Sequence, residues 1–311
     1  MASHRPQTTA QELIDFAQLG KIELARAGAL NKQTLGIKNA EGVTLLELIA
    51  ENGQIHLVPK EHITAENIKP LLASRLLHHL ASQGTLLYLP GKLLTLASLT
   101  KQDAHGWTPL HAAAINGFFD QVPAQLLTEE AMTLPTERGV TPLHLLLNTS
   151  SWEKFLEKSV IPFLNEKTLF LECQDYSSPI LRLAERGKLS ILPSRLRTEA
   201  ILLRKNSNGF SAISESAVQE NIHDLPSTVL TFKNLKNLIS TLCANRTWPW
   251  IVRTEALICM TTEERRQWRD VLLEQANNSA LTNSTRKDLT KTAQEIARFT
   301  HLESAGAWSA L

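Results

Sequence analysis

The side chains best suited to chemistry in this sequence are its histidines, but their spacing does not suggest a metal or catalytic centre. His78 and His79 are adjacent, so on a helix their side chains point about 100° apart and cannot easily share one ion. His111 and His144 each end a Thr-Pro-Leu-His segment. We therefore expect no metal site at the histidines.

Other residues with reactive side chains are equally uninformative about catalysis. The three cysteines are Cys173, Cys243 and Cys259. They are odd in number and far apart in the sequence, so they form neither a disulfide framework nor a zinc motif. Their scarcity favours a reducing compartment. The chain has no glycine-rich phosphate loop, nucleophile elbow or His-Glu-x-x-His helix. We expect no catalytic residue, no metal and no cofactor, and we do not expect an enzyme.

Composition limits the classes of partner. The 311 residues include 32 basic and 31 acidic side chains, a net charge of +1, so no overall field favours nucleic acid or an anionic membrane. No apolar run is long enough to span a membrane, and the first residues lack the apolar core of a secretory signal. These features predict a cytoplasmic protein whose partner is another protein.

An internal repeat organises most of the chain. Its clearest mark is an apolar residue followed by proline, and the six prolines are Pro59, Pro90, Pro123, Pro162, Pro193 and Pro226. Successive prolines are 31, 33, 39, 31 and 33 residues apart, and the longest step carries an insertion around 150–158. With a divergent first copy, we count about seven copies over 9–238.

Each copy reads as a pair of helices. In the best-preserved copy, Thr108 can cap a helix whose first residue is Pro109, and Gly117 can end it in a left-handed conformation. Its apolar residues then have helical spacing: Leu110, Ala113 and Ala114. A second helix should begin near each repeat proline and bury a pair such as 126–127, with Thr128 capping one further short turn. Such units bury their apolar faces only by stacking.

Two copies identify the pattern. Residues 103–114 read Asp-Ala-His-Gly-Trp-Thr-Pro-Leu-His-Ala-Ala-Ala, and 138–144 read Arg-Gly-Val-Thr-Pro-Leu-His. Both resemble the ankyrin repeat, although a proline opening the second helix is not standard there. The resemblance implies an all-α, ankyrin-like helical repeat solenoid of about seven repeats. It also implies a structural role for two pairs of residues, Thr108 with His111 and Thr141 with His144. In each pair the histidine is expected to link neighbouring turns by hydrogen bonds.

The resemblance further implies a protein–protein interaction module that binds through its concave, turn-side face. By position, the candidate partner-binding residues are Asp103, His105, Trp107, Asn116, Arg138, Val140, Asp175, Tyr176, Arg182, Glu185, Arg186, Asn208 and Phe210, with Asn148 and Gln219 beside them. The aromatic ones sit next to turns, where aromatic side chains often dominate interface energies. Alternatively, these rings pack on the adjacent turn and only stabilise it.

The last segment departs from the repeat. We divide the chain into a tail (1–8), a repeat domain (9–239) and a C-terminal helical segment (240–311). Thr261 with two acidic residues after it predicts a helix start, with an apolar stripe of Leu272, Leu273 and Ala276. A second helix is expected over about 284–300.

Two interpretations of this segment remain open. It is either a cap that covers the last repeat or a separate recognition element. The alternative function is a secreted bacterial-type effector, delivered into a host cytoplasm, whose repeats target it and whose residues 240–311 are an active or transport segment.

Overall fold

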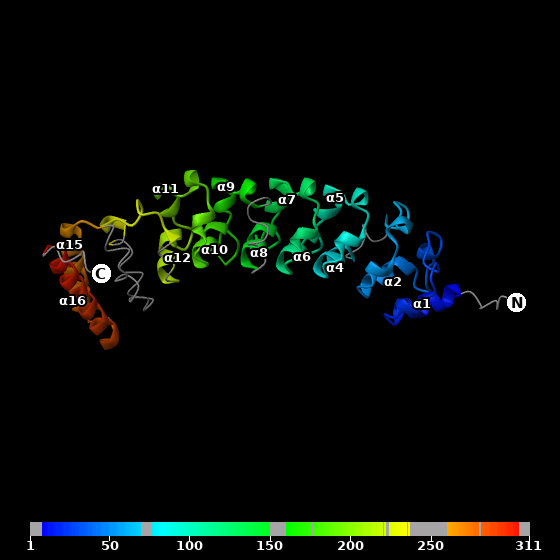
Figure 1. Cartoon of the computed structure of the whole chain (residues 1–311), viewed down its shortest axis with the longest axis horizontal. Helices are drawn as coiled ribbons and strands as arrows, with labels where there is room; N and C mark the ends of the chain where they lie inside the picture. The colour runs from blue at the N-terminus through cyan, green and yellow to red at the C-terminus, as the bar shows by residue number, and fades with distance from the viewer. Residues whose placement is uncertain are drawn as a thin grey trace. The chain divides into compact units, whose positions relative to one another are not determined.

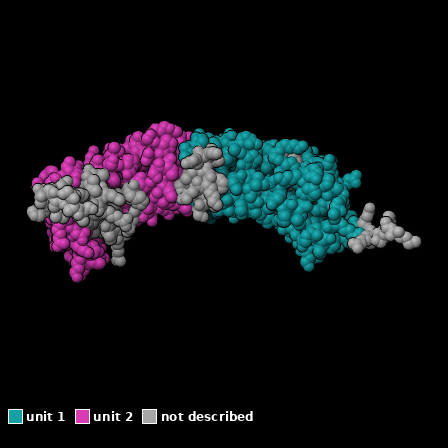
Figure 2. Space-filling model, in the orientation of Figure 1, with its two compact units in different colours: residues 1–163 teal, residues 164–311 magenta. Residues whose placement is uncertain are grey.

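The computed structural model describes residues 8–69, 76–149, 160–175, 177–219, 221, 224–234, 236, 260–279 and 281–304. These residues are helical and contain no β-strand, apart from one isolated bridge between Lys38 and Thr44, so the predicted all-α class is confirmed for them. The chain divides into two compact units, 1–163 and 164–311 (Figure 2). The predicted boundary at 239/240, the insertion at 150–158 and Tyr176 lie outside the described residues.

Unit 1 contains one longer helix for each copy of the repeat: α1 (Ala10–Gln18), α2 (Leu45–Glu51), α4 (Leu76–Ser82), α6 (Pro109–Ile115) and α8 (Pro142–Asn148). Each packs against the next, and Figure 1 shows α4, α6 and α8 side by side in one row. A second row holds the short helices α5 (Leu96–Leu99) and α7 (Glu129–Thr133). The predicted apolar face of α6 is fully buried, because residues three and four apart share one side of a helix: Leu110, Ala113 and Ala114 are all 0% exposed.

Local side-chain chemistry sets where these helices begin and end. Thr108 caps α6 by accepting a hydrogen bond from the His111 N–H at 3.4 Å, and Pro109 takes a first-turn position, as predicted. Gly117 follows the helix with φ 75°, a left-handed conformation that ends the helix and that glycine adopts without strain.

The prediction that a second helix begins near each repeat proline was wrong in detail. Pro123 has φ −57° and ψ 124°, an extended conformation, and it separates two 3₁₀ turns, η7 (Phe119–Gln121) and η8 (Ala124–Leu126). Proline pushes the preceding Val122 out of the helical region, so the chain cannot enter an α-helix there. The α-helix starts only at α7, capped by Thr128, which is the short turn that the sequence predicted.

Pro59 and Pro90 likewise separate pairs of 3₁₀ turns, and further 3₁₀ turns lie elsewhere in unit 1. The turns are η1 (Ile22–Leu24), η2 (Thr34–Gly36), η3 (Ile55–Leu57), η4 (Lys60–His62), η5 (Leu86–Tyr88), η6 (Gly91–Leu93) and η11 (Ile161–Phe163). Several of the 3₁₀ turns of unit 1 contribute buried side chains to the core, such as Ile55 of η3, Leu86 of η5 and Phe119 of η7.

Unit 2 repeats the arrangement and then changes. Its longer helices, α10 (Pro179–Glu185) and α12 (Ala212–Val218), pack together. The other short elements are α9 (Glu166–Leu169), η12 (Leu189–Ile191), η13 (Ser194–Leu196) and α11 (Glu199–Leu202).

A helical hairpin of α15 (Thr262–Ala276) and α16 (Asn283–Ser304) closes the described part of the chain. Thr261 caps α15, as predicted. The buried seam of α15 is Trp268 and Leu272, both 0% exposed. Leu273 was predicted in this stripe but is 38% exposed, because consecutive helical residues point about 100° apart. Among the residues with a described position, no helix is long and apolar enough to cross a membrane.

A serine at the start of α10 yields a stability prediction. Ser178 takes the cap position, but its hydroxyl is buried and makes no hydrogen bond. We expect Ser178→Ala to leave the free energy of unfolding unchanged or raise it by up to about 1 kcal/mol, because an unsatisfied buried group is removed. Thr108→Ala, which removes a working cap, should lower it by about 2 kcal/mol. Urea denaturation of both variants measures this, and an equal loss in both would contradict it.

Candidate partner-binding site

The candidate residues lie beside tight turns that Asp or Asn side chains shape. The Asp103 Oδ1 atom accepts hydrogen bonds from the N–H groups of His105 and Trp107, at 2.9 and 3.0 Å. In unit 2, Asn206 Oδ1 accepts in the same way from the N–H groups two and four residues later, at 3.0 and 2.8 Å. One carboxylate oxygen of Asp103, a predicted binding residue, therefore serves to hold the turn.

Two predicted residues of the first turn differ in exposure. His105 is exposed, with Nδ1 3.7 Å from a carboxylate oxygen of Glu137. Trp107 is only half-exposed, and its ring is tilted against the His111 ring with centroids 5.5 Å apart. The packing alternative for Trp107 therefore has direct geometric support.

The other candidates of unit 1 lie at different points of their copies. Asn116 caps the end of α6 and donates to the Ala112 carbonyl at 2.9 Å. Arg138 is exposed, whereas Val140 is half-buried and offers its backbone carbonyl to a neighbouring histidine.

His111 links two successive turns. Its Nδ1 accepts from the Thr108 N–H at 3.0 Å and lies 2.8 Å from the Thr108 hydroxyl, while its Nε2 donates to the Val140 carbonyl at 3.1 Å. Burial lowers its pKa to about 4. His144 is also buried and lies 2.8 Å from the Thr141 hydroxyl. The contacts of His111 therefore join one turn to the next, whereas the Thr141 contact of His144 lies within its own turn.

Sequence reasoning missed a third histidine of this kind. His78 Nε2 lies 2.9 Å from the Trp107 carbonyl, 29 residues ahead, the same step as from His111 to Val140. His79 Nε2 instead lies 2.9 Å from the Glu51 carbonyl in the preceding copy. The signal was present, because His78 precedes His111 by one 33-residue period, but the Thr-Pro that precedes His111 and His144 is absent there.

In unit 2 the structure gathers predicted residues around a pocket, which we call the turn-side pocket. It has a volume of about 220 Å³ and is lined by Asp175, Ser177, Leu181, Arg182, Glu185, Asn206, Asn208, Phe210 and Glu215. Five of these were predicted from the sequence, whereas Ser177, Leu181, Asn206 and Glu215 were missed. Arg186 is exposed at the end of α10 and is not part of the lining, and Tyr176 lies outside the described residues.

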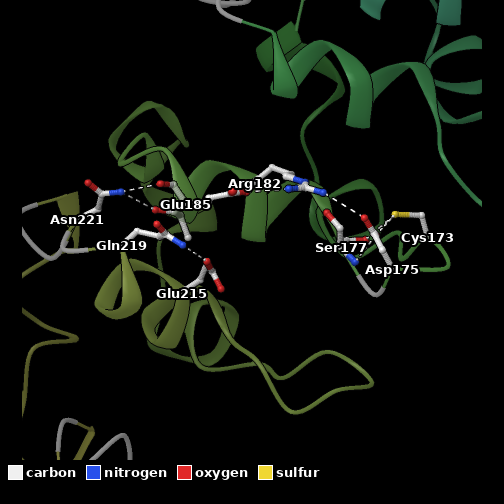
Figure 3. Close-up of polar contacts among 9 residues, drawn as sticks. Cys173, Asp175, Ser177, Arg182, Glu185, Glu215, Gln219 and Asn221 are labelled. Carbon is white, nitrogen blue, oxygen red and sulfur yellow. Dashed lines mark hydrogen bonds and ion pairs between the residues drawn. The ribbon is translucent and has the colours of Figure 1, made fainter. Parts of the chain in front are cut away.

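Arg182 occupies a central place among the charges of this pocket (Figure 3). One of its guanidinium nitrogens, Nη1, lies 2.9 Å from Glu185 Oε2, and the other, Nη2, lies 3.2 Å from Asp175 Oδ2. The arginine side chain is 24% exposed, so this paired arrangement is partly shielded from water. Two carboxylates thus share one cation.

Glu215 is the less compensated acid. It projects from α12 and accepts one hydrogen bond from the Gln219 amide at 3.0 Å. Burial raises its pKa and the charge of Glu185 adds to that, whereas the Gln219 hydrogen bond and Arg182 lower it. The pKa of Glu215 is therefore raised, chiefly by burial. Its position one 33-residue period after Arg182 could have revealed it.

The cysteine beside the pocket is not a reactive thiol. Cys173 Sγ donates to Asp175 Oδ1 at 2.7 Å and lies 3.4 Å from the Ser177 carbonyl. Burial, together with the Asp175 carboxylate, raises its pKa to about 11, so the nucleophilic thiolate is scarce at neutral pH. Cys173 therefore belongs to the packing of the turn.

The described residues contain no group of three or more His, Cys, Asp or Glu side chains placed to hold a metal ion. The carboxylates of the turn-side pocket are thus arranged around an arginine rather than as a ligand set. No family model matches the sequence, and no curated protein matches it.

Proposed function

We propose that this chain is a protein-binding module made of about seven ankyrin-like repeats, and that it binds a partner protein on its turn side. The repeat assignment is supported by the regular order of elements in each unit. It is also supported by histidine links from one copy to the next, from His78 to Trp107 and from His111 to Val140. Rigid repeats of this kind present a preorganised surface, which lowers the entropy lost on binding.

The turn-side pocket carries the proposal. Five residues assigned to partner binding from repeat position alone line this hollow together. Its rim includes Phe210, which is 36% exposed although it is a large apolar side chain. Exposed aromatic and arginine side chains in a pocket are typical of the residues that dominate binding energies between proteins.

The C-terminal hairpin fits the role of a cap in this proposal. The Phe232 ring, which lies in the last copy, meets the Trp268 ring of α15 edge-on with centroids 6.1 Å apart. An apolar end of a repeat array needs such a cover to stay in solution. The cap interpretation requires no chemistry from 240–311.

Photocrosslinking tests the proposed binding face. A benzoylphenylalanine at position 210 should capture one protein in the cells that produce the chain. The same group at position 195, an exposed arginine on η13 away from the pocket, should not. The captured protein should bind the purified chain, and Phe210→Ala should weaken that binding about tenfold. Capture from position 195 alone, or equally from both positions, would move the site off this face.

A further inference from the structure

The turn-side pocket has an excess of negative charge. Its lining contains the carboxylates of Asp175, Glu185 and Glu215 and a single cation, Arg182, which leaves two negative charges in excess when all are ionised. The contacts of Arg182 are to the first two of these acids, at 3.2 and 2.9 Å. Glu215 receives a hydrogen bond from one described donor, the neutral amide of Gln219. A half-buried carboxylate in that position is stabilised by an added cation.

The uncharged part of the lining favours the same occupant. Phe210 presents an exposed ring, and aromatic faces attract cations placed within about 6 Å of the ring centre. A group with several N–H donors and a flat face would suit both the Phe210 ring and the Glu215 carboxylate.

Size and geometry limit the source of that cation. The pocket volume of about 220 Å³ is smaller than the roughly 300–1,000 Å³ of typical small-molecule sites. It suits a single long side chain inserted from a bound protein. The described carboxylates do not converge as metal ligands would.

We propose that the turn-side pocket receives an arginine side chain of the partner protein, whose guanidinium stacks on Phe210 and donates hydrogen bonds to Glu215. The inference rests on the proposed function and names the partner's anchoring group. Arginine suits the site better than lysine, because its planar fork can stack on a ring and bond a carboxylate through two nitrogens simultaneously.

The test uses amide chemical shifts of the full chain during titration with N-acetyl-arginine-N-methylamide. The amides of 206–210 and 212–218 should shift, with a dissociation constant on the order of millimolar for a single side chain. The citrulline analogue, which has nearly the same shape but no charge, should cause no saturable shift. The lysine analogue should bind more weakly than the arginine probe by about threefold or more, because it lacks the planar fork.

Two variants assign the contacts. Glu215→Gln keeps the shape of the side chain and should weaken the arginine probe about fivefold. Phe210→Leu keeps an apolar side chain without a π face and should weaken it about threefold. Glu274→Gln removes an exposed carboxylate on α15, outside the pocket lining, and should leave binding unchanged.

Several outcomes would overturn the inference. These are equal binding of the citrulline or lysine analogue, no saturable shift with the arginine probe, or an equal effect of Glu215→Gln and Glu274→Gln. Failure here is distinguishable from failure of the proposed function. A partner crosslinked at position 210 while the arginine probe fails leaves the binding face intact and removes only the anchoring group.

Discussion

Acidification from pH 7 to pH 4 is expected to lower the free energy of unfolding by about 3 kcal/mol through the protonation of one side chain of α6, His111. Burial lowers the pKa of His111 to about 4 in the folded chain, against 6.5 for an unperturbed histidine. Its Nδ1 must stay unprotonated to accept from the Thr108 N–H, while Nε2 donates to the Val140 carbonyl. The neutral ring is therefore part of the link between two turns.

The direction of this pH effect follows from the two pKa values. Between pH 6.5 and pH 4 the unfolded chain binds a proton at this histidine that the folded chain does not bind. The stabilisation from neutral His111 is thus complete above pH 6.5, is lost as the pH falls toward 4, and changes no further below that. Urea denaturation at half-unit pH steps would measure the slope.

A variant that cannot titrate isolates the histidine from the carboxylates that also protonate in this range. His111→Asn retains an acceptor near the Thr108 N–H but loses the bond to the Val140 carbonyl. It should be about 2 kcal/mol less stable than wild type at pH 7 and about 1 kcal/mol more stable than wild type near pH 4, because only wild type loses about 3 kcal/mol between the two. A stability difference that stayed constant from pH 7 to pH 4 would show that the proton binds equally to both states.

Helix ends and turns could be predicted from the sequence because their causes are local. The Thr108 cap, the Pro109 start and the Gly117 end depend on residues within a few positions of one another. The short helix after Thr128 was predictable for the same reason. The missing N–H of Pro123 does not by itself predict the 3₁₀ turns on either side of it, because those turns depend on the steric effect of the proline ring on Val122.

The pocket could be predicted only in part, because its residues meet through packing between copies. Arg182, Glu185 and Phe210 were found from their positions in the repeat. Glu215 occupies the register of Arg182 in the next helix, and its effect depends on α10 and α12 lying side by side. The repeat period alone does not give the distance between α10 and α12. That distance determines whether the oppositely charged Arg182 and Glu215 share one pocket or face solvent separately.

The second large effect is expected at Gly106. Gly106→Ala should lower the free energy of unfolding by about 3 kcal/mol, from two sources that add. The residue has φ 77°, a left-handed conformation that costs alanine about 1–2 kcal/mol. A Cβ atom there would also lie 2.9 Å from Thr136 Cα and 3.0 Å from Glu137 N, and neither backbone atom can rotate away as a side chain could.

Gly42→Ala separates these two sources, because Gly42 has φ 82° in the corresponding turn of an earlier copy, and a Cβ there would meet nothing within 4 Å. This variant should lose only about 1 kcal/mol, measured by the same urea denaturation. The excess loss at Gly106 then reports how firmly its turn is held against the next one, where the Glu137 N–H donates to the His105 carbonyl at 3.1 Å. Equal losses at both glycines would mean that neighbouring turns separate freely enough to admit a methyl group. Successive copies would then be joined mainly by their helices and by the histidine links.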